Sequence, residues 1–344
     1  MRECESNRRR CGFPRALRLT AWLWVVGAPG LAGLPGLADA PGLVAPPGLT
    51  AQQVADTAYM PPVLDPEFPE GQGPLVLIDE AHHNFHTADG RYLAFARLLR
   101  RDGYVVEPNT QPFTSAVLAR TDVLVIANAL AEGNVEVDDW VLPTPSAFTG
   151  AEIDAVEEWV RRGGSLLLIA DHMPIPGAAE ALAAAFGLHF QNGFAVDTLA
   201  ASAESGSGDA TFRRSDGSLR SHPVVSGRGP EERVDSVTTF MGQAFRAGGE
   251  AVPLMVLPEH WILLLPEVAW EFSETTPRIP AANLLQGAVL EHGEGRVAAF
   301  GEAAMFTAQL SGEERAPMGM NLPVAAQNYR LVLNVLHWLT GRLD

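Results

Sequence analysis

The stretch "FTGAEIDAVEEWVRRGGSLLLIADH", residues 148–172, holds a helix pattern followed directly by a strand pattern. Thr149 with Glu152 three positions later is a capping-box pattern, and the pair Gly163–Gly164 is a typical helix terminator. The run "SLLLIA" is apolar after its serine, as expected of a strand that is covered on both faces. The segment therefore predicts a helix that ends at the glycine pair and a buried strand that follows it.

Strands and helices alternate on both sides of this segment. "PLVLID" (74–79) and "DVLVIANA" (122–129) are further apolar runs typical of buried strands. "GRYLAFARLLRRDG" (90–103) and "GAAEALAAAFGL" (177–188) have the apolar spacing of helices. With "YVVEP" (104–108) as a further strand and "TSAVLART" (114–121) as a short helix, four strand–helix units follow one another. They favour an α/β fold: a flavodoxin-like, doubly wound, mainly parallel sheet with helices on both faces and right-handed crossovers.

The second half of the chain is predicted to complete the same domain, 74–344. Strand-like runs occur in "RVDSVTTFMGQAF", "AVPLMVL", "LLQGAVLEHG" and "GRVAAFGEAA". The final stretch "NYRLVLNVLHWLTGRL" predicts an amphipathic helix that packs on the sheet. Before these runs, residues 198–232 are polar and rich in Gly and Ser, and we expect them to form an excursion or lid over the domain.

The first 73 residues are predicted to lie outside that domain. Residues 1–40 have the basic start, apolar run and small residues near Ala38 or Ala40 that are typical of a signal peptide. Gly and Pro break the run short of the ~20 apolar residues that a spanning helix needs, although an uncleaved membrane anchor is the alternative. Residues 41–73 are rich in Pro, Gly and Ala and predict an extended linker. We therefore expect an exported protein, periplasmic or extracellular.

Composition excludes several kinds of chemistry. The formal net charge of −17 disfavours a nucleic-acid partner, because a phosphate backbone would be repelled. The chain contains no lysine, which excludes Schiff-base and lysine general-base mechanisms. Its two cysteines, Cys4 and Cys11, lie in the predicted signal peptide, so the mature domain has no thiolate nucleophile, disulfide or zinc–thiolate site.

Polar residues follow three of the predicted strands, at the edge where ligands bind in open parallel sheets. The first group follows "VLID", the second is Asp171–His172 and the third is Glu302. We expect these groups to meet over one rim of the sheet. The predicted catalytic residues are Asp171, His172, Glu80 and Glu302, and the predicted substrate-binding residues are Asn84, His82, Asn321 and Asn328.

Each group has alternative roles. His83 and His86 are candidate ligands for a divalent metal, Zn or Mn, but their spacing matches no motif such as H-E-x-x-H, and ordinary loop hydrogen bonds are the alternative. Asp79 could cap its turn. Asp171–His172 stands where a strand turns into a helix, the geometry of a nucleophile elbow, with neither Ser nor Cys. Asp as nucleophile and His as base stay open. No phosphate-binding loop occurs, so no nucleotide cofactor is expected.

The chain resembles the class I glutamine amidotransferase-like superfamily, and within it the ThuA-like proteins and exported domains of unknown function that lack the catalytic Cys. The resemblance is carried by "VLIDEAHHNFHT", "LARTDVLVIANAL", residues 148–172, "SHPVVSG" and "GRVAAFGEAAMF". It implies a flavodoxin-like fold with its site at the elbow. Amidotransferases carry Cys at that elbow and this chain carries Asp171–His172, so glutamine hydrolysis through a thioester is not implied. ThuA-like relatives imply a carbohydrate-related role.

The sequence is compatible with three functions. The first is an exported hydrolase, metal-assisted or not, that acts on a small polar or carbohydrate-like substrate. The second is a non-catalytic module of the cell envelope that binds a glycan or a protein, and the third is a structural envelope component. The expected partner is a small-molecule or glycan ligand, with no nucleic acid, and with membrane contact only through an uncleaved signal segment.

Overall fold

The computed structural model describes residues 53–137, 139–199 and 209–344. The predicted signal peptide, the first part of the predicted linker and part of the predicted polar excursion lie outside these residues. Contacts divide the chain into Met1–Asp39 and Ala40–Asp344, and the second unit contains everything described below. No helix within the described ranges is long and apolar enough to span a membrane.

A nine-stranded sheet forms the centre of the domain, in the order β3-β2-β4-β5-β15-β14-β10-β6 with β11 paired to β14. Its parallel strands are β3 (Val105–Asn109), β2 (Leu75–Asp79), β4 (Val123–Ala127), β5 (Ser165–Ile169) and β15 (Gly295–Phe300). The antiparallel extension comprises β14 (Leu285–His292), β10 (Phe245–Ala247), β6 (Leu188–Phe190) and β11 (Val252–Val256). The predicted mixed α/β fold with a large, mostly parallel sheet is confirmed, and the antiparallel pairings are additional to that prediction.

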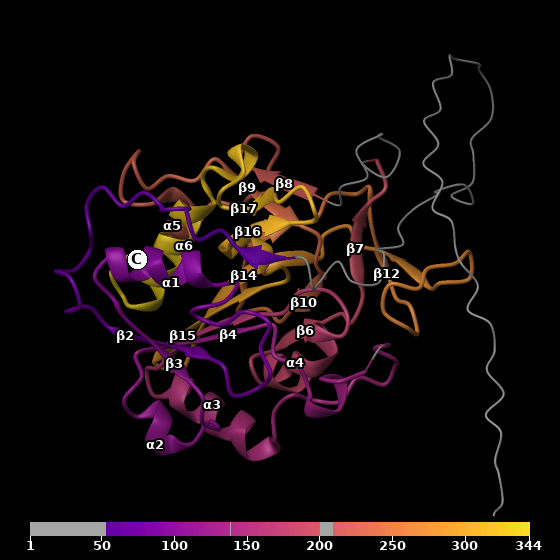
Figure 1. Cartoon of the computed structure of the whole chain (residues 1–344), viewed down its shortest axis with the longest axis horizontal. Coiled ribbons are helices and arrows are strands. Elements are labelled where there is room, and N and C mark those ends of the chain that lie inside the picture. Colours follow the sequence, from indigo (N-terminus) through magenta and orange to yellow (C-terminus); the bar gives the residue numbers. More distant parts are fainter. Residues whose placement is uncertain (1–52, 138, 200–208) are drawn as a thin grey trace, which may run out of the picture. The chain divides into compact units, whose positions relative to one another are not determined.

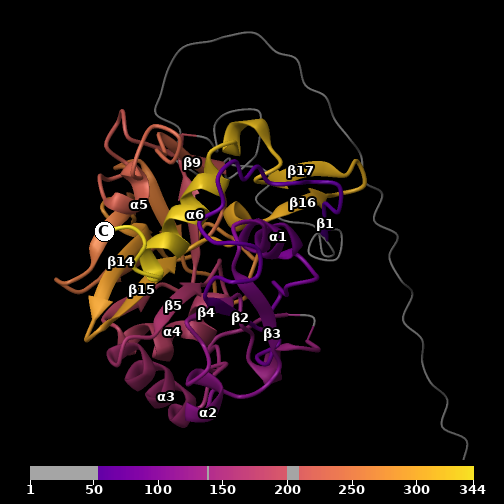
Figure 2. The same cartoon turned by 90° about the vertical axis from the view of Figure 1, so that its left-hand side faces the viewer.

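Both faces of β2, β4 and β5 are buried, which explains why the sequences of these three strands are almost continuously apolar. In β2, Val76 and Ile78 pack in one hydrophobic core and Leu77 packs in the other. Helices α1 (Leu93–Arg101) and α6 (Asn328–Leu339) cover the first face. Helices α2 (Ser115–Leu118), α3 (Gly150–Arg161) and α4 (Ile175–Ala185) cover the second, and Figure 2 shows the two helix layers on opposite sides of the sheet.

The ends of α3 match the sequence pattern. The Thr149 side chain accepts a hydrogen bond from the Glu152 backbone N–H, and the Glu152 carboxylate accepts one from the Thr149 backbone N–H, so the predicted capping box is present. After the helix ends, Gly163 adopts φ of +110°, a left-handed conformation that costs glycine little. The helix and the following strand therefore form where the sequence predicts them.

Smaller sheets surround the central one (Figure 1). One contains β1 (Val54–Ala55), β16 (Ala308–Ser311) and β17 (Ala316–Gly319); a second contains β13 (Arg278–Pro280), β12 (Trp261–Leu264) and β7 (Phe194–Asp197); a third contains β8 (Asp209–Arg213) and β9 (Ser236–Phe240). The short helices are η3 (Glu132–Asn134), α5 (Pro223–Ser226), η5 (Ala304–Phe306) and η6 (Pro323–Ala325). These sheets place β7 and β12 beside the end of β5.

Residues 53–73, here called the N-terminal strap, are the described part of the predicted linker. They lie against the domain: β1 pairs with β16, and the ring of Phe68 packs edge-on against Tyr104 at 5.0 Å between centroids. Glu67 of the strap forms ion pairs with Arg228 at 2.7 Å and Arg342 at 3.2 Å. The strap is thus joined to the folded unit by backbone, aromatic and ionic contacts, where the sequence predicts an extended linker.

Candidate functional site

The register of the parallel strands brings the ends of β4, β5 and β15 to one edge, and with them two of the three predicted polar groups, Asp171–His172 and Glu302. Ile169 at the end of β5 pairs with Ala127 of β4 on one side and with Phe300 of β15 on the other. The residues that follow these three positions therefore leave the sheet side by side. They include Asn128, Asp171 and Glu302.

Five side chains at this edge interact with one another and are here called the edge cluster: His86, Arg91, Tyr92, Asp171 and Glu302. Burial and the charge of Asp171 together raise the pKa of Glu302 and of Tyr92, while burial lowers the pKa of Arg91 and Asp171 offsets part of that shift. Burial and the charge of Arg91 lower the pKa of His86. Such coupling requires that the groups be neighbours, since charge interactions fall with distance. The sequence predicts His86, Asp171 and Glu302 among these five.

Glu302 is a buried carboxyl whose pKa is strongly raised. Its side chain is buried, and burial followed by the charge of Asp171 holds the pKa of this carboxyl well above its usual range. Backbone N–H groups of Ala304 and Met305 donate to its two oxygens at 2.7 and 2.8 Å, which offsets part of that rise. A carboxyl that stays protonated beside a second carboxyl is the usual arrangement of a catalytic acid and base.

Two polar atoms of the cluster are buried without a hydrogen bond in the described part of the chain: the hydroxyl of Tyr92 and Nδ1 of His86. The two rings pack edge-on at 4.8 Å. Burial, then Glu302 and Asp171, raise the pKa of Tyr92 well above its usual value, while burial and Arg91 lower that of His86. Both groups are therefore neutral near pH 7, and buried polar atoms with no partner are uncommon enough to mark a candidate site.

Asn128 positions the start of the Asp171 turn. Its Oδ1 accepts a hydrogen bond from the backbone N–H of Asp171 at 3.0 Å, and its carbonyl accepts one from the N–H of Phe85 at 3.1 Å. Asn128 is itself left-handed, with φ of +51°, a conformation that Asn tolerates better than most residues. This residue joins the ends of β4 and β5 to the loop that carries His86.

His172 lies among aromatic rings rather than among the acids. Its ring stacks on Phe194 at 4.9 Å and meets the edge of Trp270 at 4.4 Å. Its Nδ1 bonds to the carbonyl of Met173 at 3.0 Å; because a carbonyl only accepts, Nδ1 carries the proton and Nε2 is left as an acceptor. Phe272 and Met241 complete this group, here called the aromatic wall.

Two members of the aromatic wall have strained backbones. Trp270 and Met241 adopt φ of +68° and +91°, which is unfavourable for residues with a Cβ atom. Met241 precedes Gly242, where an added Cβ would lie 3.0 Å from the Cβ of Glu302, so the wall is adjacent to the edge cluster. Strained residues of this kind are enriched at functional sites.

His82 has a different environment from His86. Its Nδ1 lies 2.9 Å from Asp79 Oδ2 and its Nε2 lies 2.9 Å from Glu152 Oε1, so the buried ring bridges two carboxylates. The rings of Phe113 and Phe148 pack against it at 4.6 and 4.7 Å. This Asp79–His82–Glu152 bridge ties the end of β2 to the start of α3, so its polar groups are already engaged within the protein.

The bridge predicts a pH window of stability. Burial lowers the pKa of His82, but the carboxylates of Asp79 and Glu152 outweigh burial, so the pKa of His82 is raised. Burial raises the pKa of Glu152, but hydrogen bonds with Thr149 and His82 outweigh burial and lower this pKa to about 2. The contribution of His82 is complete below pH 6.5 and is lost as pH rises through its raised pKa. That of Glu152 is complete above pH 4.5 and is lost as pH falls toward about 2.

We therefore expect the stability difference between the wild type and a His82→Gln variant to be largest between pH 4.5 and 6.5 and to shrink on either side. Urea unfolding across pH measures this. A difference that stays constant from pH 3 to pH 9 would contradict the assignment of charge to the bridge.

The other predicted site residues have bonds within the protein or face solvent. Glu80 accepts the backbone N–H of Ala88 at 2.8 Å, and Asn84 bonds to the backbone at His82 and Ala127. Asn321 donates to Asp56 and Gln309, on the small sheet of β1, β16 and β17. Asn328 bonds to Thr238 and Met305 at the start of α6, and His83 is exposed.

The candidate metal ligands do not fit a metal site. His83 is exposed and His86 is buried, and neither ring makes a hydrogen bond to a carboxylate. Within residues 53–137, 139–199 and 209–344, no group of three or more His, Cys, Asp or Glu side chains is placed to hold an ion. No step below uses a metal.

Sequence reasoning missed Arg91 and Tyr92. They stand at the start of α1, where the pattern reads as the beginning of an amphipathic helix, and Tyr92 is its N-cap residue. The available signal was their position, five and six residues after His86, at the end of the same loop. Asn128 gave a similar signal, since it directly follows the apolar run of β4.

Comparison with solved structures shows a likeness in fold. The mmIFT52 N-terminal domain has a TM-score of 0.53 and 14% identity, and the match covers 77% of this chain and 97% of that domain. The fold is also similar to that of a ThuA-like protein from Bacteroides uniformis, with a TM-score of 0.47 and 13% identity over 80% of this chain and 96% of that one. A cytoplasmic protein from Salmonella typhimurium has a TM-score of 0.45 and 16% identity, and the match covers 78% of this chain and 99% of that one. No family model and no curated protein matches the sequence. At these identities the likeness concerns the fold alone.

Proposed function

We propose that this chain is an exported hydrolase of a small polar or carbohydrate-like substrate, with Asp171 and Glu302 as its acid–base pair. The observation that carries the proposal is the buried Glu302, whose pKa is held high by burial and by Asp171. Enzymes obtain an acid and a base from two carboxyl groups by giving them different environments. Here Glu302 is buried, whereas Asp171 is half-buried and open to a substrate.

In this proposal Asp171 acts on the substrate as base or nucleophile. The backbone N–H of His172 donates to Asp171 Oδ1 at 2.8 Å, and Asn128 holds its backbone, so the carboxylate is oriented before a substrate arrives. Glu302 supplies the proton, and the hydroxyl of Tyr92, coupled to both acids, is the remaining proton carrier of the cluster. Export rests on the predicted signal peptide in residues 1–40.

The aromatic wall supports a substrate that contains a ring. Ligand sites combine apolar and aromatic surface with a few polar groups, and His172, Trp270 and Phe272 provide such a surface beside Asp171. The strained backbones of Trp270 and Met241 favour the same location. A sugar ring has both an apolar face and hydroxyl groups, so it suits the wall and the acids together.

The fold gives the proposal its context. Numbered along the chain, the five parallel strands lie in the order 2-1-3-4-5, and from this order we infer a flavodoxin-like arrangement. The residues after β5 form the strand-to-helix turn at which amidotransferases carry Cys, and this chain has Asp171–His172 there. We infer a ThuA-like branch of that superfamily without thioester chemistry. A shared fold does not determine function, so the acids carry the argument.

The alternative is a non-catalytic module that binds a glycan or a protein at the cell envelope. Two observations favour it: both oxygens of Glu302 already accept backbone N–H groups, and the aromatic wall could hold a ligand without chemistry. A screen of the purified full-length chain against glycosides, sugar esters and small amides, paired with a glycan-binding array, separates the two. Turnover that requires Asp171 supports the hydrolase, and binding without turnover, unchanged in an Asp171→Asn variant, supports the module.

The raised pKa of Glu302 predicts the pH dependence of the hydrolase. The acid form exists below the raised pKa and is lost as pH rises through it, so kcat/KM should fall on the alkaline side. In a Glu302→Gln variant this dependence should disappear and the rate should drop by about 10²-fold. A parallel thermal melt is needed, because the Gln amide replaces one oxygen that accepts a backbone N–H. A folded variant with the wild-type pH profile would remove Glu302 from the mechanism.

A further inference from the structure

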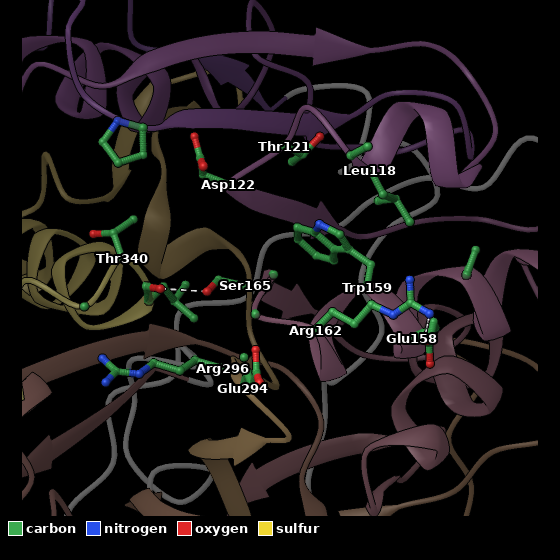
Figure 3. A pocket seen from close by; sticks show the side chains of 18 of the residues that line it. Leu118, Thr121, Asp122, Glu158, Trp159, Arg162, Ser165, Glu294, Arg296 and Thr340 are labelled. Carbon is green, nitrogen blue, oxygen red and sulfur yellow. Dashed lines mark hydrogen bonds and ion pairs between the residues drawn. The ribbon is translucent and has the colours of Figure 1, made fainter.

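A cavity of about 670 Å³ lies at the opposite edge of the sheet from the edge cluster (Figure 3). It is lined by residues at the amino ends of the parallel strands, among them Pro74 before β2, Asp122 before β4 and Ser165 at the start of β5. Its volume is within the range of small-molecule sites. Because ligands in parallel sheets bind at the other edge, the cavity is separate from the proposed hydrolase site.

Helix ends make this cavity electronegative. Residues at the carboxyl ends of α3 and α6, including Gly163, Gly164 and Leu339, belong to its lining. The carboxyl end of a helix carries about half a negative charge, which favours a cation nearby. The Arg296 guanidinium is an example of a cation at the carboxyl end of α6, because it donates a hydrogen bond to the carbonyl of Trp338.

Trp159 provides an aromatic surface in the lining. One side of its ring lies directly on Gly164, where an added Cβ would be 2.2 Å from Trp159 Cε2, so only glycine allows this packing. Figure 3 shows the ring within the lining, between Thr121 and Leu118 on one side and Arg162 on the other. The indole N–H makes no hydrogen bond to any residue that the structure describes.

The charged side chains of the lining are unevenly paired. Glu158 forms ion pairs with Arg161 and Arg162, so one carboxylate is shared by two guanidinium groups. Asp122 accepts only the backbone N–H of Leu75, at 2.7 Å. Asp122 and Glu294 have no cationic partner within the described ranges, and both are exposed. Two carboxylates without a cationic partner therefore belong to the same lining as the aromatic ring.

We propose that this cavity binds a small organic cation, with its ammonium or guanidinium group over the ring of Trp159 and near Asp122 and Glu294. An aromatic face attracts a cation through its quadrupole, and the carboxylates and helix ends add the opposite charge. The ligand class follows from charge complementarity, because the described lining holds three carboxylates, of Asp122, Glu158 and Glu294, against two guanidinium groups, of Arg162 and Arg296. The inference is independent of the hydrolase proposal.

The test uses the full-length chain and two probes, choline and arginine amide, with 3,3-dimethylbutan-1-ol as the neutral isostere of choline. Calorimetry at low salt should detect the cations and not the isostere, and added salt should weaken binding. A Trp159→Leu variant should bind roughly fivefold more weakly. Glu294→Gln, at an exposed position, should also weaken binding and keeps the test decisive if the Trp159 variant does not fold.

Three results would overturn the proposal: no binding of either cation, equal binding of the neutral isostere, or binding unaffected by both Trp159→Leu and Glu294→Gln. An Asp171→Asn variant serves as the control for location. It should bind the cations as the wild type does, and loss of binding in that variant would assign the cations to the edge cluster instead.

Discussion

A His82→Ala variant is expected to lose about 3–5 kcal/mol of the free energy of unfolding. The substitution removes the ring that bridges Asp79 and Glu152 and leaves Asp79, which is fully buried, without its charge partner. It also opens space between Phe113 and Phe148. Breaking a buried ion pair by removing one partner is costly because the remaining charge stays desolvated, and the cavity adds to that cost.

The neighbouring histidine supplies the control. His83 is exposed and left-handed, with φ of +49°, so His83→Asn preserves the backbone preference and should change stability by no more than about 0.5 kcal/mol. Urea unfolding followed by tryptophan fluorescence at pH 6 measures both variants. Similar losses at positions 82 and 83 would mean that the bridge does not stabilise the fold.

An Asp171→Asn variant is expected to lower kcat by about 10²- to 10⁴-fold on any substrate that the wild type hydrolyses. Asparagine has the same shape, and its Oδ1 can still accept the N–H of His172, so the turn after β5 should keep its structure. The asparagine side chain cannot accept a proton as a base or attack the substrate as a carboxylate. The thermal midpoint should therefore change little while the rate falls.

Asp89→Asn is the matched control for this experiment. Asp89 is an exposed carboxylate of the loop that precedes α1, and replacing it removes the same charge from the same region. Its kcat should stay within about twofold of the wild type, consistent with a surface substitution. If Asp89→Asn and Asp171→Asn reduce the rate equally, the effect of Asp171 is one of long-range charge and not of chemistry.

Much of the fold follows from local sequence. Strands β2, β4 and β5 are continuous apolar runs, and α3 has both a capping box and a glycine terminator, so tertiary packing reinforces what each segment prefers alone. Strands such as β13, with the sequence RIP, and β17, with APMG, are short, carry proline and have no period of their own. They form because a neighbouring strand pairs with them, β12 with β13 and β16 with β17, and not from a preference of their own.

The sequence predicts which edge of the sheet carries the site, but it does not predict the individual side-chain contacts within the site. That Asp171 and Glu302 meet follows from parallel strand topology. Which histidine joins them does not, because His82 and His86 stand in one irregular loop whose path depends on the left-handed backbone of His83 between them. His82 therefore joins Asp79 and Glu152, while His86 joins Tyr92 and Arg91, and no periodicity in the sequence encodes this division.

The N-terminal strap belongs to the folded unit. A shortened chain that starts at Pro74, where the regular strand–helix pattern starts, would lack β1, one of the two strands paired with β16, the ring that covers Tyr104 and the carboxylate between Arg228 and Arg342. It would present an unpaired strand edge and uncovered aromatic surface to other molecules, both of which promote aggregation. Expression of the folded unit therefore calls for a start before Val54.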